Sequence, residues 1–115
     1  MKLMNGYDKE EALAFMRKGI NRKEHASLAE RIDELLDQCI DADMEFMFNT
    51  GVLDEDGNGG DEYYEDDDAI EFMVEKLAAA NRLDPEQAVK LASLVDDYMD
   101  LQQAYLESKG LVAWD

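Results

Sequence analysis

The segment IDELLDQCIDADMEFMFNTGVLDEDGNGGDEYYEDDDAIEFMVE, from Ile32 to Glu75, decides the fold and concentrates the charge of this chain. It contains seventeen Asp and Glu residues and no Lys or Arg, whereas the flanking parts are nearly balanced. The segment therefore holds almost all of the formal net charge of −18. A charge of this size attracts basic proteins and repels nucleic-acid phosphates and anionic membrane surfaces.

Length and composition fit one domain over residues 1–115. Apolar residues make up 46% of the chain and it has one proline, which argues against disorder despite the charge. It has neither a run of eighteen apolar residues nor a signal-like apolar core at the N-terminus. Cys39 is the single cysteine, so no internal disulfide can form. We expect a soluble cytoplasmic protein that contacts neither nucleic acid nor membranes directly.

Caps and apolar spacing predict the first two helices. Asp8 caps a short helix over residues 9–18. Asn21 and Glu24 form a capping-box pattern, and the helical spacing of apolar residues that follows predicts a long helix. Gly51 is expected to end this second helix.

The third helix is separated from the second by an acidic, glycine-rich loop over residues 51–60. Its start is expected near Asp61 or Tyr63, because the acidic run that follows suits a helix N-terminus. The apolar spacing then continues to Ala80.

The fourth helix has the clearest start, with Asp84 as its cap and Pro85 at its first position. It is expected to run to Gly110, and the apolar tail over 111–114 to pack back on the other helices. No strand-like alternation occurs. The fold class predicted is all-α, a small helical bundle of three long helices plus one short N-terminal helix.

The second helix carries its acids on one side. At 100° per residue, a row of carboxylates spaced four residues apart lies opposite the apolar arc. Met44 and Phe48 fall within this acidic arc, where we expect them to be partly exposed. Apolar residues surrounded by a charged rim are typical of protein interfaces. A solubility coat is the alternative explanation. Together with the acids before and in the third helix, the candidate partner-binding residues are Asp33, Asp37, Asp41, Met44, Glu45, Phe48, Glu62, Glu65, Asp66, Asp67 and Asp68.

Three single residues need separate explanations. Asp43 falls within the apolar arc, and three explanations are open for it. It is a boundary residue, it has a basic partner such as His25, or it is a buried acid with a shifted pKa. His25, the only histidine, is expected at the surface. Cys39 is expected to be a buried apolar filler.

The loop also fits the pattern D-x-[DN]-x-[DN]-G-x5-E and so resembles an EF-hand calcium loop. The resemblance implies calcium ligands at Asp54, Asp56, Asn58, Gly60 and Glu65. The chain departs from that family in having Asp61 at the eighth position and no second loop to pair with.

No catalytic motif stands out, so we expect no enzyme. In size and charge the chain is similar to phage-encoded DNA mimics that block restriction enzymes or CRISPR nucleases. That similarity implies an acidic inhibitor that occupies the cationic nucleic-acid groove of a nuclease or another nucleic-acid-binding protein. The alternatives are a calcium-binding module and a structural or assembly protein of a phage or small operon.

Overall fold

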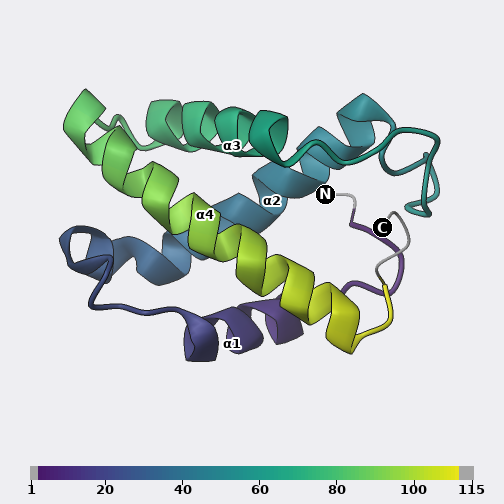
Figure 1. The fold of residues 1–115 in the computed structure, drawn as a ribbon, viewed down its shortest axis with the longest axis horizontal. Coiled ribbons are helices and arrows are strands. Elements are labelled where there is room, and N and C mark those ends of the chain that lie inside the picture. The colour runs from purple at the N-terminus through teal and green to yellow at the C-terminus, as the bar shows by residue number, and fades with distance from the viewer. Residues whose placement is uncertain (1–2, 112–115) are drawn as a thin grey trace.

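The computed structural model describes residues 3–111, and it confirms the all-α prediction (Figure 1). Within that range there is no β-strand, although Leu53 and Gly59 form one isolated bridge. None of the described helices is both long and apolar enough to cross a membrane. The elements are, in chain order, α1 (Lys9–Gly19), the 3-10 helix η1 (Ala26–Arg31), α2 (Ile32–Thr50), α3 (Asp66–Ala80) and α4 (Pro85–Ser108).

α2 is the central helix, and it contacts α1, η1, α3 and α4. Figure 1 shows α1 along the lower edge, α3 along the upper edge and α4 crossing in front of α2. Ten of the nineteen α2 residues are buried, more than the single stripe that a surface helix buries. Met44 is one of them and is fully buried, so its expected exposure among carboxylates is wrong.

α2 starts later than the capping-box pattern predicts. Asn21 does accept hydrogen bonds from the backbone N–H groups of Lys23 and Glu24, at 3.1 and 3.4 Å, but only turns follow. His25 lies at 3% exposure, with its Nε2 2.5 Å from Asp97 on α4. The expectation that His25 is a surface residue is therefore wrong. The contact with α4 holds this stretch in turns and in η1, and the α-helix begins at Ile32.

α3 also starts later than expected, at Asp66 instead of near Asp61 or Tyr63. The Tyr64 hydroxyl donates to Asp43 Oδ1 at 2.6 Å, which draws this stretch toward α2. The next residue, Glu65, has extended backbone angles. The three aspartates that follow occupy the first turn of α3, where the helix dipole favours negative charge.

The other predicted helix boundaries are formed by local contacts. Asp8 accepts a hydrogen bond from Glu11 N at 3.0 Å and caps α1. Asp84 and Gln87 form a reciprocal capping box at the start of α4, with Pro85 as its first residue. Gly51 ends α2 with φ +83°, a left-handed conformation that glycine adopts without strain.

The loop after α2 folds back on the helix it follows. Leu53 N donates to Met47 O at 3.0 Å, and Gly60 N donates to Val52 O at 2.8 Å. Val52 and Leu53 are buried in the core, so the loop is anchored by apolar contacts as well as by its backbone. A Cβ on Gly60 would overlap the carbonyl oxygen of Gly51. This close approach requires a residue without a side chain.

The C-terminal tail is described only at its first residue. Leu111 N donates to Leu106 O at 2.8 Å, and its half-buried side chain lies against Gly6. The rest of the predicted apolar tail, residues 112–114, lies outside the described residues.

Candidate protein-binding surface

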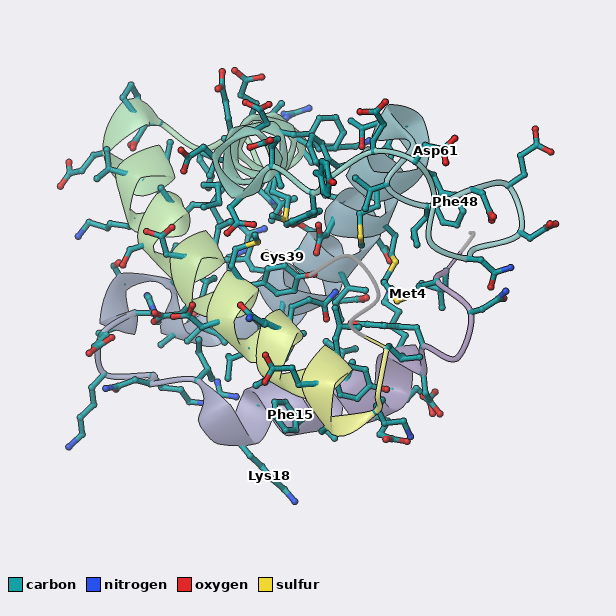
Figure 2. All side chains as sticks on the ribbon, turned by 45° about the vertical axis from the view of Figure 1, so that its right-hand side comes forward. Met4, Phe15, Lys18, Cys39, Phe48 and Asp61 are labelled. Carbon is teal, nitrogen blue, oxygen red and sulfur yellow. The ribbon has the colours of Figure 1, made fainter. Side chains whose placement is uncertain are left out.

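Within residues 3–111, the largest group of charges without an ion pair lies along residues 66–75 of α3 and the stretch 61–65 before it. We call this group the acidic ridge. All its members are exposed, and none forms an ion pair with a cation of residues 3–111. In Figure 2 side chains that end in oxygen stand out from the upper part of the molecule, and Asp61 lies beside the end of α2. The acidic ridge consists of Asp61, Glu62, Glu65, Asp66, Asp67, Asp68, Glu71 and Glu75.

Helix geometry sets the spacing of the acids on α3. Asp68, Glu71 and Glu75 are three and four residues apart and share one exposed face, opposite the buried Ala69 and Met73. With a rise of about 1.5 Å per residue, they follow one another at about 4.5 and 6 Å along the axis. This is the same order as the spacing of DNA phosphates, about 3.4 Å per strand. A packed helix also keeps this spacing fixed.

Tyr63 is the apolar group that the acidic ridge exposes. Its side chain is 80% exposed and follows Glu62 directly. Tyrosine is enriched among the residues that dominate protein interfaces, because it offers a large apolar area and one hydroxyl. The sequence interpretation did not select Tyr63, which it placed at the start of the third helix, because a helix start gives no sign that an aromatic side chain is exposed.

Four acids of α2 differ from those of the ridge, because each of the four forms an ion pair within the molecule. We call Asp33, Asp37, Asp41 and Glu45 the α2 row. Lys76 of α3 pairs with the last of them. Asp33, the first of them, pairs with Arg22 at 2.9 Å and with Arg17 at 3.5 Å. Lys9 of α1 lies between Asp37 and Asp41 and pairs with both.

These pairs change what the α2 row can offer to a partner. Its carboxylates are still 41–54% exposed, but each has a cation from another part of the chain. The cations that the 32–75 segment lacks are thus supplied by α1, by the turn after it and by α3. Charge available to a partner is therefore greater on the acidic ridge than on the α2 row.

Replacing Lys9 should destabilise the fold by exposing repulsion within the α2 row. In Lys9→Met, Asp37 and Asp41 lose their shared cation and repel each other across one helical turn. We expect a loss of about 1 kcal/mol of unfolding free energy at low salt and less at high salt. Urea denaturation at both salt concentrations measures it. Lys18→Met is the control, since Lys18 is exposed and forms no ion pair in the described structure. Equal effects of both substitutions would contradict the prediction.

Phe48 is half-buried, in agreement with its expected partial exposure. It lines a cavity of about 450 Å³ between α2 and α3, together with Ala42 and Leu77. The Lys76–Glu45 ion pair lies at the same cavity. Figure 2 shows Phe48 and Asp61 in the same region, near the loop that follows α2.

Asp43 is the buried acid among the alternatives that the sequence left open. It is 1% exposed, and it forms no ion pair with any base of residues 3–111. Tyr64 donates to its Oδ1, and Tyr98 and Gln102 of α4 donate to its Oδ2 at 2.7 and 3.4 Å. Gln102 in turn accepts a hydrogen bond from Tyr7 at 2.7 Å. We call these five residues the Asp43 network; it ties α4 and the stretch before α3 to α2.

Burial raises the pKa of Asp43 to about 6, because a charge is poorly solvated in the core. The hydrogen bonds from Tyr64, Tyr98 and Gln102 act in the opposite direction, and the negative charge of Asp66 raises the pKa further. Burial also raises the pKa of the Tyr98 hydroxyl and of the Cys39 thiol, so both groups are neutral at pH 7. Tyr98 therefore acts as a hydrogen-bond donor, and Cys39 fills space in the core. Cys39 is fully buried, which confirms the prediction.

The loop predicted to bind calcium is held by its own hydrogen bonds. Asp54 Oδ1 accepts from the backbone N–H groups of Asp56 and Asn58, at 2.9 and 3.0 Å. Asn58 Oδ1 accepts from Asn5 Nδ2 at 2.8 Å and so is occupied by the N-terminal segment. In the described chain, the loop acids and Glu65 do not bring three acidic ligand atoms within 4.8 Å of one another. The calcium site remains a prediction, and it would require the loop to rearrange.

Comparison of the chain with known protein families, with characterised proteins and with solved structures gives no significant match. The functional interpretation therefore rests on the geometry and charge of this chain alone.

Proposed function

We propose that this chain is a non-enzymatic acidic inhibitor that binds the cationic nucleic-acid groove of a nuclease or another nucleic-acid-binding protein. The acidic ridge is the contact surface, and Tyr63 is its apolar anchor. The observation that supports this proposal most is the ridge itself, eight exposed carboxylates without an ion pair in the described range. A nucleic-acid groove is built to bind closely spaced negative charges, and it gains free energy when its counterions are released.

The surrounding structure supports binding in preference to a simple solubility coat. A solubility coat needs charge but no fixed geometry. Here Tyr64 anchors the ridge in the core through Asp43, while α3 fixes the spacing of the acids that follow. Tyr63, the residue before this anchor, is exposed. An exposed aromatic side chain next to a rigid charged surface adds affinity, not solubility.

Neutralising one face of the ridge should abolish most of the binding. The test variant combines Asp68→Asn, Glu71→Gln and Glu75→Gln. The partner is first captured from a cell lysate at low salt, released at high salt and purified. We expect the variant to bind it at least about tenfold more weakly, with a shallower dependence on salt, because fewer counterions are released. Duplex DNA should compete with the native chain for this partner.

A matched control separates the ridge from net charge. Glu86→Gln, Asp96→Asn and Asp100→Asn remove the same charge from exposed positions on α4. This control should keep its affinity within about twofold. The proposal is wrong if both triple variants weaken binding equally, or if the captured proteins do not bind nucleic acid.

A further inference from the structure

A second cluster of ionisable side chains lies away from the acidic ridge, where the turn after α1 meets α4. Glu24 and His25 belong to that turn, and Asp97 belongs to α4. One ligand atom from each of the three lies within 4.8 Å of the others. His25 is buried, Asp97 is half-buried and Glu24 is exposed. The cluster thus extends from the core to solvent.

The hydrogen bond between His25 and Asp97 explains only part of this arrangement. It satisfies the imidazole Nε2, at 2.5 Å from Asp97 Oδ2. It gives no reason for Glu24 to lie beside Asp97, which has the same charge, and Glu24 forms no ion pair with any cation of residues 3–111. A third carboxylate, Asp100, lines the same cavity of about 230 Å³ as Glu24 and Asp97. Like charges that gather around a cavity are stabilised by a bound cation.

The donor atoms indicate which cation would fit. One imidazole nitrogen and two carboxylate oxygens are ligands of zinc and similar transition ions, whereas calcium and magnesium prefer oxygen alone. Two ligands about 2.0–2.1 Å from a tetrahedral zinc ion lie about 3.3 Å apart. His25 Nε2 and Asp97 Oδ2 would therefore separate by about 0.8 Å to admit the metal. Side-chain rotation of the half-buried Asp97 is sufficient for a shift of that size.

We propose that Glu24, His25 and Asp97 bind one divalent transition-metal ion of the zinc type. The three residues supply three ligands, and the cavity beside Glu24 and Asp97 leaves a fourth position for water. An ion at this place would link the turn after α1 to α4, two parts that the sequence separates by about seventy residues. The site does not depend on the acidic ridge or on its partner.

The test uses the full-length chain, first freed of metal, and cobalt(II) as an optical probe of zinc sites. We expect visible absorption bands of a tetrahedral cobalt site that saturate at one equivalent, and zinc should displace them. Because the chain has one histidine, shifts of the His25 ring signals in the NMR spectrum report metal ligation directly. Zinc should also raise the melting temperature, because it binds only the folded arrangement.

Two variants and one control make the test specific. His25→Gln keeps a side-chain donor for Asp97 and should abolish the cobalt bands and the zinc-dependent rise in melting temperature. Asp97→Asn should do the same and serves if His25→Gln loses its helical circular dichroism. The control is Asp56→Asn combined with Asp61→Asn, which removes acidic charge far from His25 in the chain and should change neither signal. Binding of many weak equivalents that persists in both variants would overturn the proposal, as would metal-induced shifts confined to residues 54–65.

Discussion

Asp43→Asn should gain about 3 kcal/mol of stability relative to the native chain as the pH rises from about 4 to about 8. The pKa of Asp43 is about 6 in the fold against an ordinary value of 3.8. Between these values the folded chain holds a proton that the unfolded chain has released. The native protein therefore loses stability as the pH rises through the folded pKa, whereas the uncharged asparagine has no such loss.

The constant part of the substitution does not affect this prediction. The carboxylate of Asp43 has two acceptor oxygens for its three donors, whereas an asparagine amide has one. The variant therefore loses hydrogen bonding by an amount that does not depend on pH. Urea denaturation of both proteins across the pH range isolates the difference in slope. Glu71→Gln is the control, because Glu71 is exposed on α3 and forms no ion pair in the described structure. A constant difference between native protein and Asp43→Asn would show that Asp43 does not bear the shifted pKa.

Gly60→Ala should cost about 2–4 kcal/mol of unfolding free energy. The added Cβ would overlap the carbonyl oxygen of Gly51, which is rigid backbone at the end of α2. That oxygen also accepts a hydrogen bond from Glu62 N at 3.3 Å. Relief of the overlap requires the loop to move away from α2 and to break the bond between Gly60 N and Val52 O. Urea denaturation gives the loss, and amide exchange at Gly60 and Glu62 shows where it arises.

Asp61→Ala is the matched control for this loop, because Asp61 is the next residue and is exposed. It should change the free energy of unfolding by less than about 0.5 kcal/mol. If Gly60→Ala is as mild as this control, the loop does not pack against the end of α2 as described.

Local sequence was sufficient to predict the helix boundaries that depend on neighbouring residues. Asp8, Asp84 with Pro85, and Gly51 act through contacts within a few positions of the chain, and each has the predicted role. Helical periodicity identified the all-α class for the same reason.

Residues whose environment depends on distant parts of the chain were beyond such reasoning. His25 and Asp43 are positioned by contacts with α4 that span 72 and 55 residues. Met44 is buried because α2 is enclosed by other helices, which one apolar arc does not show. The cations of the α2 row come from other elements as well. For the ridge, the sequence prediction contained Glu62, Glu65 and the three aspartates at 66–68, but it left out Asp61, Glu71, Glu75 and the exposed Tyr63.

The anchor of Tyr64 in the Asp43 network has a consequence for the kinetics of complex formation. The hydrogen bond from Tyr64 to Asp43 holds the backbone of this stretch in place before any encounter, so association would cost less backbone entropy. A surface prepared in this way favours rapid, charge-steered encounters and slow release. For the inhibitor proposed above, the core would thus influence how long the chain stays on its target, although the core residues do not touch that target.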